Sequence, residues 1–188
     1  MPSSEICKYA PLQQEHDIAI GRLAEDHSAA VNKMILMQYQ QLRQHPEVKH
    51  THLFHGRYEN TYIPRSLIPA IEPVLQMGLA YAEQLLGIAA SSLRLGFWFN
   101  EMHGGHQTTL HTHDDDDELL SAAYYISVAE NSGDLKIHTK SREIRYISPQ
   151  EGSIILFSPE LPHAVTENKS GEMRLSVAMN FGRLVPDN

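Results

Sequence analysis

Cysteine is almost absent from this sequence of 188 residues, which contains only Cys7. A single thiol cannot form an internal disulfide, and chains without disulfides are typical of reducing compartments. The sequence also lacks any apolar run of the ~20 residues that a membrane-spanning helix needs. Its first residues have neither the basic start nor the apolar stretch of a signal peptide. We therefore expect a soluble, cytoplasmic protein that does not bind membranes.

Positive charge is scarce as well. The 15 Lys and Arg residues stand against 23 Asp and Glu residues, which gives a formal net charge of −8. An acidic chain without a basic stripe is poorly suited to gripping a phosphate backbone, so we expect no nucleic-acid partner. The length fits one domain, over residues 1–188. Histidine, by contrast, is abundant, and the 12 copies suggest a metal site.

Helical spacing dominates residues 1–91. One apolar pattern predicts a helix over 28–45 that Pro46 ends. A second pattern predicts a helix over 66–86, with Gly87 as its C-cap. Two segments between these helices are expected to be short strands or an ordered loop: 50–55 and 56–63.

The pattern changes to period two from residue 92 onward. Many short strands separated by turn residues are typical of a sandwich or a jelly-roll barrel. We therefore expect an α+β fold that is mainly β, in which a barrel over 92–182 carries the N-terminal helices on its outside. The expected strands cover 93–99, 107–113, 121–128, 134–139, 143–148, 153–157 and 173–181.

The last predicted strand has two different faces. One face is apolar and should pack beneath the helices: Leu175, Val177, Met179 and Phe181. The other face is mostly polar and should line the barrel interior: Arg174, Ser176, Ala178 and Asn180. A polar interior in a small barrel usually indicates a pocket rather than a packed core.

The strongest local motif is the pair His111 and His113. Residues i and i+2 of a strand point to the same side, so both imidazoles can reach one ion. His163 follows an apolar strand and is the candidate for a third ligand. Three protein ligands on one face of an octahedron leave positions open for substrate and oxygen.

Carboxylates next to this pair leave two alternatives open. A run of acidic residues over 114–118 is usually a solvated loop. However, Asp115 has the same strand parity as His113 and could replace His111 as a ligand. Glu118 could join the histidines as a further ligand.

Several short motifs over about 98–181 together resemble a known family: the small bacterial and phage proteins classed as 2-oxoglutarate/Fe(II) oxygenases. Their order and spacing make the match specific. Besides His111 and His113, the matching pieces are 98–100, Gly105, 121–126, 132–135, 149–152, 156–159, 161–163 and 174–181.

This resemblance implies a double-stranded β-helix that binds Fe(II) between the histidine pair and the distal His163. It also implies that Arg174, eleven residues past His163, binds the C5 carboxylate of 2-oxoglutarate, because its planar fork suits a carboxylate. Tyr125 is expected to assist Arg174, and Asn100 to support the site. The departure from the family pattern is His113, where a carboxylate is usual; three neutral imidazoles leave the iron more positive.

The implied activity is an Fe(II)- and 2-oxoglutarate-dependent dioxygenase that hydroxylates a small molecule or an amino-acid-type substrate. Two other functions fit the same fold. One is a cupin-type metalloenzyme that uses Glu118 with the three histidines and needs no 2-oxoglutarate, since the spacing from Gly105 to Glu118 nearly matches the first cupin motif. The other is a non-catalytic module that binds a metal or ligand. For the quaternary state, a homodimer is one option.

Overall fold

The computed structural model describes residues 9–54, 56–113 and 117–184. Its helices are α1 (Glu25–Leu42) and α2 (Glu72–Leu86), with short 3-10 turns η1 (Pro69–Ile71) and η2 (Ala90–Ser92). The strands in chain order are β1 (Gln13–Glu15), β2 (Ile18–Arg22), β3 (Lys49–Phe54), β4 (Arg57–Tyr62), β5 (Leu93–Met102), β6 (Thr108–His111), β7 (Glu118–Ser127), β8 (Leu135–His138), β9 (Ile144–Ile147), β10 (Ser153–Phe157), β11 (His163–Val165) and β12 (Arg174–Arg183).

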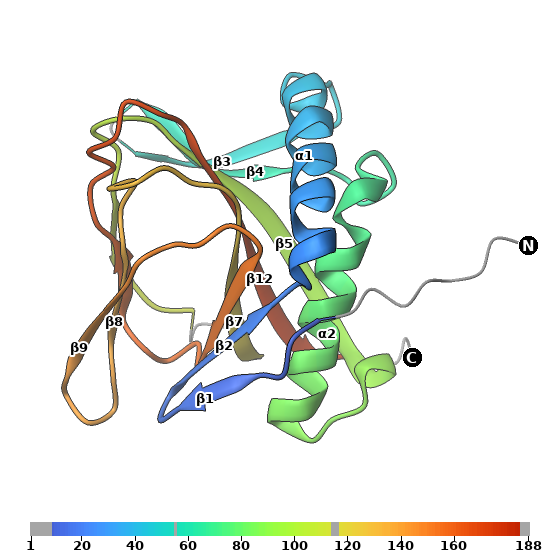
Figure 1. Cartoon of the computed structure of the whole chain (residues 1–188), viewed down its shortest axis with the longest axis vertical. Coiled ribbons are helices and arrows are strands. Elements are labelled where there is room, and N and C mark those ends of the chain that lie inside the picture. Colours follow the sequence, from blue (N-terminus) through green and yellow to red (C-terminus); the bar gives the residue numbers. More distant parts are fainter. Residues whose placement is uncertain (1–8, 55, 114–116, 185–188) are drawn as a thin grey trace, which may run out of the picture.

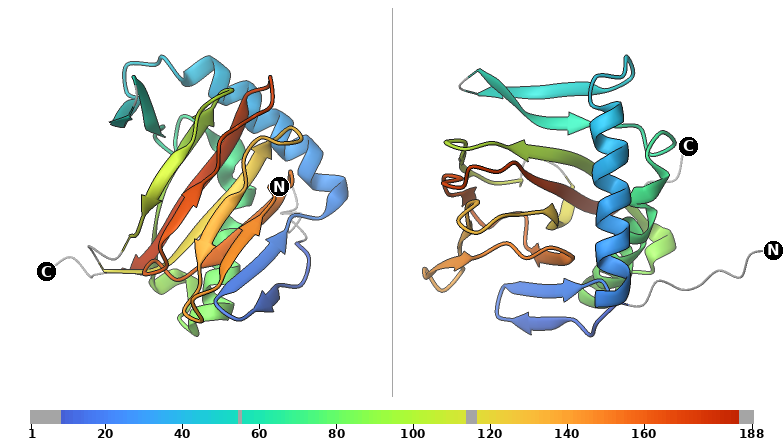
Figure 2. Two further views of the ribbon diagram at one scale, coloured as in Figure 1. Left: turned by 90° about the vertical axis from the view of Figure 1, so that its left-hand side faces the viewer. Right: turned by 45° about the horizontal axis from the view of Figure 1, so that its top comes forward.

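Two antiparallel sheets face each other (Figure 1). The large sheet has eight strands in the order β1-β2-β10-β7-β12-β5-β4-β3, and the small sheet has four in the order β6-β11-β8-β9. Figure 2 shows the long central strands of the large sheet side by side. The helices cover one face of this sheet and the small sheet faces the other (Figure 1). The expected mainly β jelly-roll with helices on its outside is confirmed.

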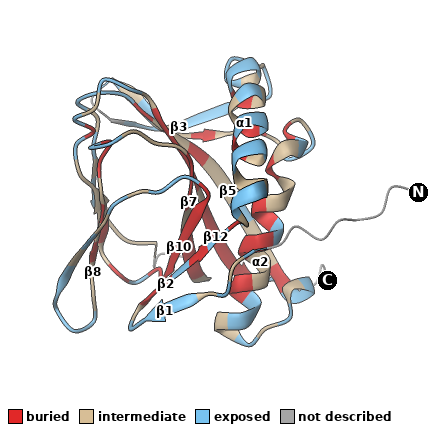
Figure 3. Ribbon diagram, in the orientation of Figure 1, coloured by how far each residue is buried: buried red, intermediate tan, exposed pale blue. Residues whose placement is uncertain are grey.

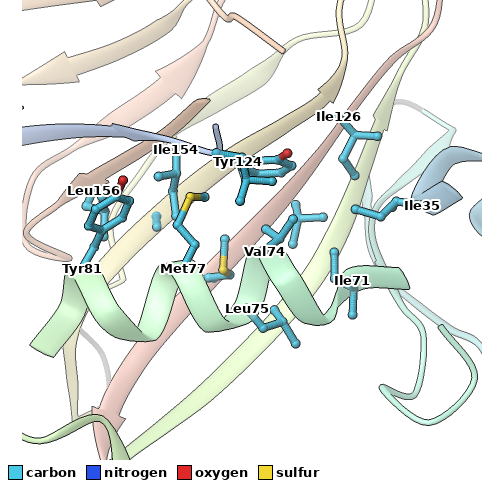
Figure 4. Packing of buried hydrophobic residues seen from close by; sticks show 14 of the residues in the cluster. Ile35, Ile71, Val74, Leu75, Met77, Tyr81, Tyr124, Ile126, Ile154 and Leu156 are labelled. Atoms are coloured by element: carbon cyan, nitrogen blue, oxygen red, sulfur yellow. The ribbon is translucent and has the colours of Figure 1, made fainter. Parts of the chain in front are cut away.

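The main hydrophobic core lies between the helices and the large sheet (Figure 3). Figure 4 shows the buried face of α2 against β7 and β10. Contact is close at Gly78 of α2, where an added Cβ would lie 3.2 Å from Met179 Sδ and 3.2 Å from Phe181 Cζ on β12. The labelled core residues of Figure 4 are Ile35, Ile71, Val74, Leu75, Met77, Tyr81, Tyr124, Ile126, Ile154 and Leu156.

Both predicted helices exist, with shifted ends. The second begins only at Glu72, because Pro69 opens a separate 3-10 turn and Pro73 occupies the first turn of α2, where its missing N–H costs nothing. Gly87 is the expected C-cap and has the left-handed φ of 66°. Among the described helices, none is long and apolar enough to cross a membrane.

The strands agree less completely with the sequence pattern. The segments 50–55 and 56–63 form the β3–β4 hairpin on the edge of the large sheet. Strands β1 and β2 were not predicted, and β2 extends the other side of this sheet by pairing with β10. The sequence also did not predict β11, the three-residue strand that begins at His163.

The alternation of β12 is confirmed. Its apolar residues belong to the core beneath the helices: Leu175, Val177, Met179 and Phe181. Its other face lines a cavity between the two sheets: Arg174, Ser176, Ala178 and Asn180. The strand that closes the core on one side therefore builds the floor of a pocket on the other.

Candidate functional site

The cavity between the sheets has a volume of about 680 Å³. Its floor is the inner face of the large sheet, and the small sheet contributes the opposite wall through β6 and β11. All six residues proposed from the sequence for metal or co-substrate binding line it: Asn100, His111, Tyr125, Arg174, His113 and His163. A cavity with a few convergent polar groups is the usual form of a small-molecule site.

Three histidines converge in this cavity, two from the neighbouring strands β6 and β11 and one from the segment after β6, which ends at His111 and is shorter than the strand expected over 107–113. His111 on β6 and His163 on β11 are register partners, and their ring centroids lie 4.3 Å apart. His113, two residues past His111, places its ring 5.0 Å from each of the other two. One ring nitrogen from each residue lies within 4.8 Å of the others, a spacing that fits a single metal ion.

Hydrogen bonds orient two of these rings. His111 Nδ1 lies 2.8 Å from the Thr109 carbonyl oxygen, and His163 Nδ1 lies 2.9 Å from the Leu161 carbonyl oxygen. Since a carbonyl only accepts, each Nδ1 must carry the proton, and each Nε2 keeps a free lone pair. This arrangement is the usual support of a metal-binding imidazole.

His163 is also the most buried histidine of the cluster, and its surroundings keep it neutral. Burial, together with His111 and His113, lowers the pKa of His163 to about 3. Its ring packs edge-on against Phe157, with centroids 4.7 Å apart. A neutral imidazole is the form that binds a metal ion.

Arg174 and Tyr125 form a second polar group in the same cavity. Both side chains are almost fully buried, and the Arg174 guanidinium carbon lies 5.1 Å from the centre of the Tyr125 ring. Arg174 Nη1 donates to the Gly133 carbonyl at 2.7 Å and more weakly to the Ser132 carbonyl at 3.4 Å. These contacts fix one side of the guanidinium.

Two donors of this group have no hydrogen-bond partner among the described residues: Arg174 Nε and the Tyr125 hydroxyl. Burial raises the pKa of Tyr125, so the hydroxyl keeps its proton. Burial lowers the pKa of Arg174, but guanidinium groups in proteins remain charged. Unpaired buried donors are costly, and an anionic ligand with several oxygens would satisfy both.

Tyr124, the alternative to Tyr125, points the other way. Its hydroxyl donates to Asn32 Oδ1 of α1 at 2.6 Å, within the core beneath the helices. The choice of Tyr125 as the pocket tyrosine agrees with this geometry. Strand alternation was sufficient to make that choice.

Asn100 lies on the cavity floor and connects two strands. Its Nδ2 donates to the Glu59 carbonyl at 2.8 Å and to Asn60 Oδ1 at 3.1 Å. It therefore holds β4 against β5 at the edge of the cavity. The β4 residues that line the cavity beside it were not predicted from the sequence, because alternation in 56–63 indicates a strand without saying which sheet it joins: Glu59, Asn60 and Tyr62.

The two carboxylates considered as alternative metal ligands have different outcomes. Asp115 lies outside the described residues. Glu118 lines the cavity, but it is not a member of the group of ligand atoms formed by the three histidines. Its Oε1 accepts from Arg94 Nη1 at 3.4 Å instead.

A family model matches the part of the chain that carries this site. Residues 97–182 match the model described as the 2OG-Fe(II) oxygenase superfamily. This segment contains all three histidines, Tyr125 and Arg174. No curated protein has significant sequence similarity to the chain.

Solved structures share the fold at low sequence identity. A Pseudomonas putida prolyl-4-hydroxylase is 18% identical, with a TM-score of 0.60 over 90% of this chain and 89% of that one. A Trichoplax adhaerens prolyl hydroxylase, in complex with a peptide fragment of the hypoxia inducible factor oxygen degradation domain, is 14% identical, with a TM-score of 0.69 over 89% and 84%. The epimerase SnoN, in complex with Fe3+, alpha ketoglutarate and nogalamycin RO, is 13% identical, with a TM-score of 0.68 over 89% and 79%.

Proposed function

We propose that this chain, which belongs through residues 97–182 to the 2OG-Fe(II) oxygenase superfamily, hydroxylates a small molecule or an amino-acid-type substrate. Membership of the superfamily makes it an oxygenase that uses Fe(II) and 2-oxoglutarate. The observation that carries the finer proposal is one cavity that contains both a histidine cluster and two unpaired donors beside it.

In this proposal His111, His113 and His163 hold Fe(II). Their ring nitrogens are close enough for one ion, and the backbone carbonyls of Thr109 and Leu161 keep two Nε2 lone pairs available. Three imidazoles add no negative charge, unlike the usual set of two histidines and a carboxylate. The donor set still fits Fe(II), because imidazole is a good ligand for iron.

Arg174 and Tyr125 would bind the C5 carboxylate of 2-oxoglutarate. Arg174 Nε and the Tyr125 hydroxyl are the donors that lack protein partners, and the positive guanidinium complements the anion. Asn100 would keep the neighbouring part of the floor in position through β4. When bound, Fe(II) and 2-oxoglutarate supply the oxidising chemistry, in which one atom of O2 enters the substrate as a hydroxyl group and the other enters succinate, with release of CO2.

The primary substrate would bind over the remaining floor of the cavity. About 680 Å³ is enough for the co-substrate together with a second small molecule or an amino-acid side chain. The peptide bound to the prolyl hydroxylase relative supports an amino-acid-type substrate. The Trp98 and His113 rings, 5.9 Å apart, would flank the substrate near the metal.

Anaerobic titration tests the proposal. The full chain is loaded with Fe(II), and 2-oxoglutarate is added while the visible charge-transfer band expected of this superfamily is followed. We expect the band to saturate at one 2-oxoglutarate per chain. On exposure to air, succinate should form only when both Fe(II) and 2-oxoglutarate are present. An iron-loaded protein with neither band nor succinate would contradict the proposal.

A further inference from the structure

The cavity floor has opposite charges at its two ends. Strands β5, β12 and β7 run side by side there, so their register orders the side chains in rows (Figure 2). Arg174 begins β12 at one end. At the other end Gly182 pairs with Arg94 of β5 on one side and with Glu118 of β7 on the other.

The histidine cluster faces the middle of this floor. Trp98, which contacts the His113 ring at 5.9 Å between centroids, is the register partner of Ala178. Ala178 lies four residues from Arg174 and four from Gly182, or about 13 Å along the strand in each direction. If 2-oxoglutarate extends from Arg174 to the metal, the half of the floor beyond Trp98 is left for the substrate.

That half combines small side chains with a polar end. Ala123 and Ala178 are register partners and leave room above the floor. Beyond them the Ser121 hydroxyl donates to Asn180 Oδ1 at 2.9 Å, so both side chains are already partly satisfied. Glu118 comes next and closes this end of the floor.

Glu118 is held in place but not fully satisfied. Its Oε1 is 3.4 Å from Arg94 Nη1, and Arg94 also forms an ion pair with Asp117. Its Oε2 is buried and has no hydrogen-bond partner among the described residues. The side chain as a whole is only 12% exposed, so water can satisfy little of it.

The position of Arg94 depends on Gly182. A Cβ at residue 182 would lie 2.7 Å from Arg94 Nε and 2.8 Å from its Cζ. The guanidinium therefore crosses β12 directly over the glycine to reach Glu118, the first residue of β7, and Asp117 just before it. Among the described residues, one guanidinium faces two carboxylates here, which leaves one excess negative charge.

We propose that Glu118 binds a protonated nitrogen group, an amine or a guanidinium, of the primary substrate. A cationic donor would pair with the free Oε2 and neutralise the excess charge, which a hydroxyl group would not. The Tyr62 and Trp98 rings, 5.9 Å apart, line the same cavity, and aromatic faces favour a cation over an anion. The inference rests on the proposed function for its orientation, because the carbon to be oxidised would lie near the histidines and the cation several bonds away.

The test uses simple probes of matched shape. The cationic probes are n-butylguanidinium and n-butylammonium, and the neutral probe is n-butylurea. Binding to the full-length chain is measured by calorimetry, first without metal and then anaerobically with Fe(II) and 2-oxoglutarate. We expect both cations to bind at least about tenfold more tightly than the urea, because they can form a charge-assisted pair.

Glu118→Gln keeps the shape and removes the charge. We expect it to abolish the preference for cations, while the exposed Glu130→Gln keeps it. Failure of the cations to bind the wild-type chain, or equal binding of all three probes, would overturn the inference, and this wild-type comparison holds even if the variant folds poorly. Loss of Fe(II) from Glu118→Gln would also overturn it, since Glu118 would then be a ligand. The metal-free measurement keeps this result separate from any failure of the proposed function.

Discussion

His111 and His163 lie directly opposite each other on β6 and β11, 52 positions apart in the sequence and with ring centroids 4.3 Å apart. Each ring is turned by a hydrogen bond from its Nδ1 to the carbonyl two residues earlier. The sheet thus presents two Nε2 lone pairs to one point, and His113 adds the third ring. This pairing is the basis of the first prediction.

We expect His163→Ala to abolish stoichiometric Fe(II) binding, because it removes one of the three proposed ligands and the most buried of them. Metal content after anaerobic loading and desalting, determined by mass spectrometry, measures the effect. His103→Ala, which changes an exposed histidine outside the cavity, should retain one iron per chain. Full iron occupancy in His163→Ala would exclude the three-histidine site.

We expect that Asp115 is not a ligand of the metal. We predict that Asp115→Ala leaves Fe(II) affinity within about tenfold of the wild type, the lower end of indirect effects on metal sites. His113→Ala should lose far more. Competition with a coloured Fe(II) chelator gives both affinities under the same conditions. The opposite ranking would assign the metal to His113, Asp115 and His163.

Arg174→Met should weaken 2-oxoglutarate binding while leaving Fe(II) binding intact. Loss of one partner of a buried charge pair costs about 2–5 kcal/mol, or roughly thirty- to several-thousand-fold in affinity. Anaerobic titration of the charge-transfer band measures the change, and metal analysis confirms iron loading. A variant that binds 2-oxoglutarate as the wild type does would remove Arg174 from the co-substrate site, in which case the cupin-type function would be favoured.

The neighbouring tyrosines should respond in opposite ways to loss of their hydroxyl groups. The Tyr125 hydroxyl has no partner among the described residues, so Tyr125→Phe should change the free energy of unfolding by less than about 0.5 kcal/mol but weaken 2-oxoglutarate binding. Tyr124→Phe should cost about 1–3 kcal/mol in stability, because it leaves Asn32 Oδ1 in the core without its donor.

Denaturant unfolding and the anaerobic titration are measured on both tyrosine variants, so that each serves as the control for the other. The same pattern in both variants, or weakened 2-oxoglutarate binding in Tyr124→Phe alone, would contradict the assignment of Tyr125 to the pocket.

Local spacing in the sequence determined which side chains share a face. Side chains of a strand alternate between two faces, so the sequence alone separated Arg174 from Leu175 and Tyr125 from Tyr124. The same rule predicted that His111 and His113 share a side, although β6 ends at His111 and His113 lies two residues past it. Apolar residues at helical spacing indicated the two helices, and Gly87 marked the end of α2, whereas α1 ends at Leu42, before the expected stop at Pro46.

Only the tertiary structure decided which strands are neighbours. Backbone hydrogen bonds between strands join segments far apart in the chain. The backbone of many other strands could in principle form the same bonds. Strand β11 has only three residues, too few for an alternating pattern, yet its register with β6 is what brings His163 to His111. Likewise, the pairing of β12 with β5 and β7 brings Arg94 over Gly182 to Glu118. No local spacing in the sequence predicts this contact across three strands.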